Sequence, residues 1–280
     1  MALPFPFCQI GDFHITALSD GNMPASVDLL SGIEKCDADV IQYHAGFNDP
    51  GNIHINCYLI RGRGRIILVD AGTGPLNDRA GQLNANLAAV GVSPEEVDTV
   101  LLTHCHPDHI GGLLDAEQQP VFKSADIYLH PLEAQYWLDD EKFNGVSARV
   151  QRNFVLVRQT LNAYAAKLRF LNGDKIAEGI LPVWLPGHTP GHTGFRIHTT
   201  DKCLLIWGDI VHYPHIQAAQ PAVSILFDTD PVQAEETRKK IMEDAVSQNM
   251  IVAGMHLGQA GFANVCRAGM GYRISYSENE

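Results

Sequence analysis

Four apolar runs in this chain each lead, within a few residues, to a histidine or an aspartate. No other feature of the sequence constrains the fold more. The runs cover residues 99–103, 181–185, 203–207 and 250–254, and each is typical of a buried strand. Loops that follow buried strands are held by a rigid scaffold and often carry functional residues. We therefore expect a sheet structure in which these four strand ends meet at one edge.

Predicted strands and helices alternate along the rest of the chain. Runs rich in β-forming residues at 54–60 and 65–69, separated by Gly62 and Gly64, indicate a hairpin. The spacing of apolar residues and the end signals predict helices over residues 77–90, 131–138, 146–167 and 232–247. Strands paired locally and wrapped by helices, in two similar halves, indicate an α/β sandwich. A length of 280 residues fits one domain over 1–280.

The first cluster reads His-Cys-His-Pro-Asp-His over residues 104–109. A single histidine is usually a core or surface residue, but three with a carboxylate in six positions are hard to explain in that way. At a strand end, His104 and His106 can point to the same side, as residues two apart do. Asp108 and His109 then project from the turn that follows. Imidazole and carboxylate ligands together suit zinc, iron, manganese or cobalt.

Three further stretches supply the remaining candidate ligands. His188 stands on a loop fixed by Gly and Pro residues in the sequence L-P-G-H-T-P-G-H-T-G of residues 185–194. Asp209 completes the sequence W-G-D at the end of one apolar run, and His256 follows the last run. Because each of these side chains follows a strand, they can meet the first cluster at the same edge of the sandwich.

Together the motifs H-x-H-x-D-H, G-H-T-P-G-H-T-G, W-G-D and a late strand-end His resemble the metallo-β-lactamase superfamily. The resemblance covers nearly the whole chain. It implies a four-layer αββα sandwich in a single domain, with a two-metal site at one edge. The implied cofactors are two divalent metal ions, with Zn2+ first and Fe, Mn or Co as alternatives.

The resemblance also assigns the ligands. It implies one metal held by three histidines, a second held by one aspartate and two histidines, and one aspartate that bridges both. In that order, the residues are His104, His106 and His188; Asp108, His109 and His256; and Asp209. His192 lies in the same motif, but the family's ligand is the first His of that stretch, so His192 is expected to pack or to support a ligand.

The resemblance is closest to the methyl parathion hydrolase-like and lactonase-like branch, carried by segments such as V-D-A-G at 69–72 and Y-W-L at 136–138. It implies a hydrolase whose bridging hydroxide opens lactones or cleaves aryl esters. Aryl lactones are favoured, and organophosphate triesters are a side activity. The expected catalytic residues are Asp108, Asp209 and His212. His212 stands where acyl-homoserine lactonases carry a Tyr, which puts that particular substrate in doubt.

Four alternative functions remain open at this point. A glyoxalase II-like thioesterase shares the metal motif, although the helical glutathione site of such enzymes has no evident counterpart here. An acyl-homoserine lactonase differs at His212. A mononuclear-iron dioxygenase of the persulfide type would need fewer of these ligands. A metal-binding module without turnover is disfavoured by the complete ligand set.

The substrate pocket is expected, by motif position, to be lined by Leu76, Trp137, Phe154 and Phe227, with His212 beside them. Aromatic walls favour flat, apolar substrates such as aryl lactones and aryl esters. Packing in the core is about equally compatible with each of the aromatic residues.

The charge balance indicates which partners the chain does not favour. Lys and Arg number 20 and Asp and Glu number 32, which gives a net charge of −12 and argues against nucleic acid and anionic membranes. The expected partner is a small-molecule substrate, and the family suggests a homodimer. Six cysteines without a C-x-x-C pair, no leader signal and no long apolar run predict a cytoplasmic protein with reduced thiols.

Overall fold

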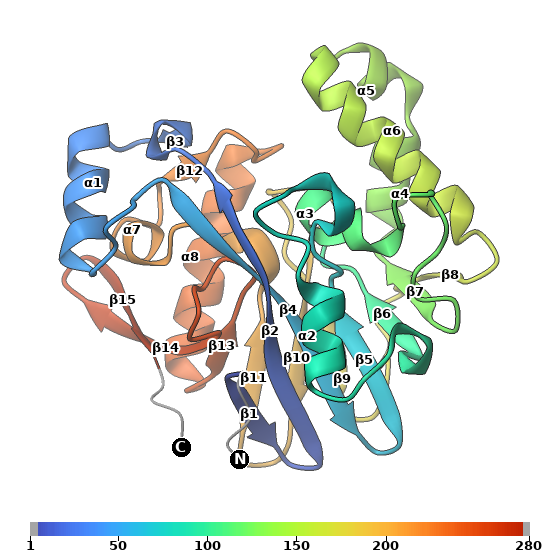
Figure 1. The fold of residues 1–280 in the computed structure, drawn as a ribbon. Helices are drawn as coiled ribbons and strands as arrows, with labels where there is room; N and C mark the ends of the chain where they lie inside the picture. Colours follow the sequence, from blue (N-terminus) through green and yellow to red (C-terminus); the bar gives the residue numbers. More distant parts are fainter. Residues whose placement is uncertain (1–4, 277–280) are drawn as a thin grey trace.

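Two β-sheets packed face to face form the centre of the computed structural model, which describes residues 5–276 (Figure 1). The first sheet has the strand order β1 (Phe7–Ile10), β2 (Phe13–Pro24), β4 (Asn52–Gly62), β5 (Arg65–Val69), β6 (Thr99–Leu101), β7 (Asp126–Leu129) and β8 (Leu168–Phe170). The second has the order β15 (Gly271–Tyr276), β14 (Phe262–Ala268), β13 (Ile251–Ala253), β11 (Cys203–Ile206), β10 (Thr193–His198) and β9 (Ile180–Trp184). A small third sheet pairs β3 (Leu30–Ser31) with β12 (Ser224–Ile225).

The strand β4 shows why the two sheets pack together. Successive residues of a strand point to opposite faces of its sheet. Tyr58 and Ile60 therefore join the apolar core between the two sheets, whereas Cys57 and Leu59 join the core beneath the outer helices. Because both faces are buried, the strand is a nearly continuous apolar run rather than an alternating one.

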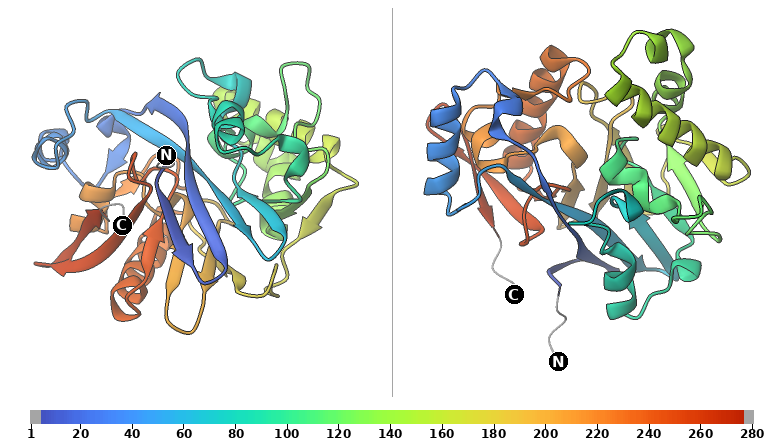
Figure 2. Two further views of the ribbon diagram at one scale, coloured as in Figure 1. Left: turned by 60° about the horizontal axis from the view of Figure 1, so that its bottom comes forward. Right: turned by 45° about the horizontal axis from the view of Figure 1, so that its top comes forward.

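Helices cover the outer face of each sheet. The first sheet is covered by α2 (Leu83–Ala89), α4 (Pro131–Leu138) and α6 (Ala148–Ala163), and the second by α8 (Pro231–Ser247). Beside the small third sheet, α1 (Lys35–His44) packs against α7 (Pro214–Ala219). Both views of Figure 2 place the hairpin of β14 and β15 (red) and the helices α4, α5 (Asp140–Asn144) and α6 (green) at opposite ends of the molecule. The order helix, sheet, sheet, helix confirms the predicted αββα sandwich.

Two pairs of parallel strands bring the loops that follow them to one edge of each sheet. In the first sheet β5 and β6 run parallel, with Val69 opposite Leu101. In the second sheet β11 and β13 run parallel, with Ile206 opposite Ala253. Parallel neighbours end at the same edge of a sheet, so the segments after each pair emerge side by side.

One prediction about the elements is wrong, and one hairpin was missed. The helix predicted over 77–90 begins only at Leu83, because Gly81 has a φ of +77° and the Asp20 carboxylate accepts the backbone N–H groups of both Gly81 and Leu83. These contacts come from β2 and are invisible in the local pattern. The hairpin of β14 and β15 was not predicted, although Val265 and Ile274 both point into the core beneath α8.

No helix within residues 5–276 is long and apolar enough to cross a membrane. The prediction that the chain has no leader signal falls partly on residues 1–4, which lie outside the described residues.

Candidate metal centre

The predicted ligands all follow strands, and the two sheets bring them to one edge. His104 and His106 lie just after β6, and Asp108 and His109 lie in the short helix α3 (Pro107–Ile110). Pro107 is the first residue of this helix, where its missing N–H costs nothing and its fixed φ suits the helix. His188, Asp209 and His256 follow β9, β11 and β13.

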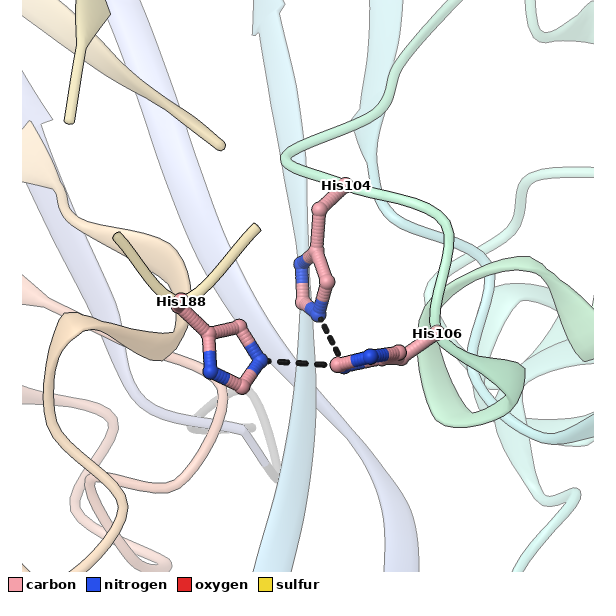
Figure 3. A group of neighbouring side chains, drawn as sticks. All are labelled: His104, His106 and His188. Carbon is pink, nitrogen blue, oxygen red and sulfur yellow. Dashed lines mark hydrogen bonds between the residues drawn. The ribbon is translucent and has the colours of Figure 1, made fainter. Parts of the chain in front are cut away.

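Three imidazoles form the first group (Figure 3). His106 Nδ1 lies 3.0 Å from His104 Nε2 and 3.0 Å from His188 Nε2. Ligand atoms about 2.1 Å from a tetrahedral zinc ion lie about 3.4 Å from one another. The three ring nitrogens therefore converge to nearly the separation that one cation requires.

The second group consists of two carboxylates and two imidazoles: Asp108, His109, Asp209 and His256. Asp209 Oδ2 lies 3.2 Å from His109 Nε2 and 3.2 Å from His256 Nε2. Asp108 Oδ2 lies 3.5 Å from each of the same two nitrogens.

Asp209 stands between the two groups. Its Oδ2 atom is 3.7 Å from His188 Nε2 and 3.9 Å from His104 Nε2, both members of the first group. One carboxylate thus reaches ligands of both groups, which is the position of a bridging ligand.

A second contact orients four of the five imidazoles in the two groups. His109 Nδ1 lies 2.6 Å from Asp70 Oδ2, His188 Nδ1 lies 2.8 Å from Asp228 Oδ1, and His256 Nδ1 lies 2.8 Å from the carbonyl oxygen of His54. His104 Nδ1 lies 3.0 Å from Thr103 Oγ1. In a neutral ring, an acceptor on Nδ1 leaves Nε2 without its proton and aimed inward, as in metal-binding histidines generally.

The protonation states of His104, His106 and Asp209 suit a cation, and that of His109 shows the pull of the nearby carboxylates on positive charge. Burial lowers the pKa of His104 and of His106, so both rings are neutral, the form that binds metals. Burial also disfavours a charge on His109, but the carboxylates of Asp209 and Asp108 outweigh it and raise the pKa of His109, so a metal ion that binds this ring must displace a proton. Burial opposes the charge of Asp209, yet the surrounding imidazoles, His109 first, hold its pKa well below the usual range.

Unpartnered atoms provide a separate test of whether a metal fits. Asp108 Oδ2, His109 Nε2 and Asp209 Oδ1 are buried and have no hydrogen-bond partner among residues 5–276. A buried polar atom without a partner is costly, and ionised carboxylates can only accept. These atoms and the donor types around them fit divalent cations.

His192 occupies a supporting position, as predicted. Its Nε2 accepts the backbone N–H of Asp209 at 2.9 Å, and its Nδ1 lies 2.9 Å from the carbonyl oxygen of Leu185. Burial lowers the pKa of His192 to about 3. Because both ring nitrogens are engaged, His192 holds the backbone of Asp209 and offers no lone pair to a metal.

A cavity of about 240 Å³ opens onto the two groups. Five of the predicted ligands or catalytic residues form its floor: His106, Asp108, Asp209, His212 and His256. Met23, Leu76 and Phe227 give it apolar sides. The predicted pocket residues Leu76, Phe227 and His212 do line this cavity.

Trp137 and Phe154 do not line the cavity, and their assignment to its wall is wrong. Both side chains lie in the core between α4, α6 and the first sheet, with exposures of 2% and 0%. Large aromatic side chains on a helix gain more free energy from burial against a sheet than from facing a water-filled cavity. Trp137 still packs edge-on against the ring of His106, with 5.7 Å between the ring centres.

The polar side of the cavity was not predicted from the sequence. Arg149 and Asn153 of α6 line it, together with Thr73 and Asn77. Residues four apart share one face of a helix, so Arg149 and Asn153 both face the cavity because α6 packs beside it. The packing of α6 over the cavity is a tertiary feature that no local pattern contained.

A four-layer sandwich with this His and Asp centre at one edge defines a class of metal-dependent hydrolases. The family model of the metallo-beta-lactamase superfamily matches residues 50–247, and the chain belongs to this superfamily. The predicted family and the predicted class, a metallo-hydrolase, are confirmed.

Two solved structures resemble the whole chain. The hydrolase AbOPH of the beta lactamase superfamily is 30% identical, with a TM-score of 0.91 over 100% of this chain and 99% of that one. AidC, a dizinc quorum-quenching lactonase solved with a product, is 24% identical, with a TM-score of 0.92 over 98% of this chain and 97% of that one.

The similarity to curated proteins is partial. Acyl-coenzyme A thioesterase MBLAC2 of Gallus gallus is 30% identical over 177 residues, which are 59% of this chain and 60% of that protein. Two other curated relatives are also matched over only part of their length, about two thirds.

Proposed function

We propose that the protein is a dinuclear metal-dependent hydrolase that opens lactones and cleaves aryl esters, with aryl lactones as the favoured class. The observation that carries this proposal is the position of Asp209 Oδ2 between two groups of ligands at the floor of a cavity with apolar sides. The proposed partner is a small molecule.

The proposed ligands are those of the two groups. His104, His106 and His188 would hold one cation, Asp108, His109 and His256 the other, and Asp209 would touch both. Zn2+ is the first candidate, since His and Asp donors suit it and AidC is a dizinc enzyme. Two such cations would supply Lewis acidity and would lower the pKa of a bound water from 15.7 to about 7.

His212 is proposed as a catalytic residue that handles a proton. Its Nε2 lies 3.1 Å from Asp209 Oδ2, and its ring stacks on His256 with 5.2 Å between the ring centres. Burial lowers the pKa of His212, so the ring is neutral and carries one proton. If Nε2 donates to Asp209, Nδ1 is left as a free base, and it has no partner among residues 5–276.

The cavity supports esters with an apolar body. Met23, Leu76 and Phe227 can pack against an aryl ring or an acyl chain, while the reacting carbonyl lies toward the floor. AidC acts as a lactonase on a closely similar fold. A phosphotriester presents a similar electrophile and is proposed as a side activity. MBLAC2 makes a thioester the second candidate substrate.

The test is a comparison of substrates with the zinc-loaded protein. The panel contains an aryl lactone, an N-acyl homoserine lactone, an aryl acetate, an acyl thioester and an aryl phosphotriester. We expect the highest kcat/KM for the aryl lactone and the aryl acetate. Preference for the thioester would replace the proposal by a thioesterase, and oxygen consumption with a persulfide would replace it by a dioxygenase.

The variant His212→Ala tests the proposed proton handling. We expect kcat to fall about 100-fold or more, the range of general acid–base catalysis. His212 also lies in a third group of possible ligands, with His188 and Asp209, but it belongs to neither proposed ligand set, so the metal content should be unchanged. Unchanged kinetics would remove His212 from the mechanism.

A further inference from the structure

A buried carboxylate lies directly behind the three-histidine group. Glu133, on the first turn of α4, has an exposure of 0% and belongs neither to the cavity lining nor to the candidate metal ligands. Its Oε2 accepts the backbone N–H of Cys105 at 3.1 Å and the indole N–H of Trp137 at 2.9 Å. Its Oε1 accepts the backbone N–H of Gly191 at 3.0 Å.

These bonds join two loops that come from different sheets. Cys105 stands between His104 and His106, on the loop after β6 of the first sheet. Gly191 stands on the loop between β9 and β10 of the second sheet, which also carries His188. One carboxylate therefore holds the backbones of the loops that carry all three histidines of the group.

The loop of the second sheet approaches α4 closely. A Cβ atom on Gly191 would lie 2.6 Å from Glu133 N and 2.9 Å from Glu133 Cγ, closer than real Cβ contacts come. Only glycine allows the loop this near to the helix. One further backbone bond, from Thr193 N–H to the carbonyl oxygen of Thr103 at 2.9 Å, joins the same two loops.

Glu133 also acts on His106 through Trp137. The indole ring, one turn later on α4, is fixed by its hydrogen bond to the carboxylate and packs edge-on against the ring of His106. Among residues 5–276, no hydrogen-bond partner holds the outer nitrogen of His106 as the partners of the other four imidazoles do. Its orientation depends on this packing and on the backbone at Cys105.

We propose that Glu133 is a positioning residue that sets the spacing of His104, His106 and His188 by tying their two loops together. The inference rests on the proposed metal centre and names a residue that controls its affinity without touching a metal. Three N–H donors need an acceptor with two equivalent oxygens. A glutamine offers one oxygen and one NH2 group, so either the Cys105 loop or the Gly191 loop loses its acceptor.

The experiment measures Co2+ binding by Glu133→Gln. The full chain is stripped of metal and titrated with Co2+ against a chromogenic chelator, and the visible spectrum of the loaded protein is recorded. We expect one of the two Co2+ ions to bind about 10- to 100-fold more weakly, the usual effect of losing a group that orients ligands. We also expect the visible band of that ion to shift.

Asp20→Asn is the matched control. Asp20 is also 0% exposed, and its carboxylate also accepts several donors: Thr73 N, Thr73 Oγ1, Gly81 N and Leu83 N. It belongs to no candidate metal group. This variant should lose stability to urea, as Glu133→Gln does, but should bind both Co2+ ions with the affinity and spectrum of the wild type.

Each outcome decides between the alternatives. If Glu133→Gln is destabilised but keeps both Co2+ affinities and the spectrum, Glu133 is merely structural and the inference is wrong. If the wild type binds no Co2+ pair, the proposed function fails first. Should Glu133→Gln not fold, Trp137→Phe removes one donor and keeps an aromatic ring against His106. It should weaken the same ion to a smaller extent, and an unchanged affinity overturns the inference.

Discussion

Side chains at the floor of the cavity and at its mouth, where Leu76 and Arg149 lie, are held in different ways. At the floor, Asp209 and His256 are buried, and the His256 ring is oriented by the carbonyl oxygen of His54. Directly behind the floor, His104, His109 and His188 are fully buried, and each ring is oriented by a contact on its outer nitrogen. At the mouth, Leu76 is 49% exposed, and Arg149 forms no hydrogen bond or ion pair with any residue in 5–276.

This difference indicates that the floor carries out the reaction and that the mouth determines which substrates bind. Reacting groups must be held within a fraction of an ångström, so the floor needs buried networks in which every member depends on another. The mouth needs only to complement the part of the substrate that does not react. Its residues can change with little effect on the fold. Substitutions at the floor or behind it should therefore alter metal content, kcat or both, and substitutions at the mouth should alter KM.

The largest effect is expected for His106→Ala at the floor. The variant removes one of three nitrogens that converge on one position, and we expect hydrolysis to be lost and the metal content to fall. Metal analysis and rates on the preferred ester or lactone check both. Retained activity in a metal-free preparation of this variant would refute the metal mechanism.

A smaller effect is expected for Asp228→Asn, one step away from the floor. Asp228 Oδ1 lies 2.8 Å from His188 Nδ1 and fixes the orientation of that ring. We expect metal affinity to fall about 10- to 100-fold. Competition with a chelator measures this loss. Asp230→Asn changes a carboxylate at the nearby N-terminus of α8 that accepts the Gln233 N–H and forms no hydrogen bond with a candidate ligand in residues 5–276, so this variant should keep the wild-type affinity.

The smallest effect is expected for Arg149→Ala at the mouth. An exposed ion pair contributes about 0.2–1 kcal/mol, so KM for an ester that carries a carboxylate on its non-reacting part should rise at most about fivefold. KM for a matched neutral ester should not change. Arg152, on the same helix and outside the cavity lining, provides the control variant Arg152→Ala. A fall in kcat or in metal content would abolish the distinction between floor and mouth.

The sequence was informative about the floor for a physical reason. Strand ends are fixed by the sheet, so residues such as His104 and Asp209 could be placed from the apolar runs before them. The orienting partners were harder to find. Asp228 acts on a residue 40 positions earlier, and this pairing depends on how the loop before α8 folds back.

The mouth was less predictable, since its composition depends on how α6 packs. The residues assigned to it from motif position included Trp137 and Phe154, which the hydrophobic effect draws into the core instead. Arg149 and Asn153 take their places on the neighbouring face of α6. The start of α2 was wrong for a similar reason, because a carboxylate on β2 caps the segment before it.

The order of the candidate ligands along the chain has a consequence for biosynthesis. Chains emerge from the ribosome N-terminus first, at about 5–20 residues per second. The histidines and aspartate at 104–109 are exposed early, whereas His256 follows β13, a late strand of the second sheet. A nascent or prematurely terminated polypeptide thus carries only part of the proposed ligand sets, and binding of both proposed ions would require a chain whose translation has passed residue 256.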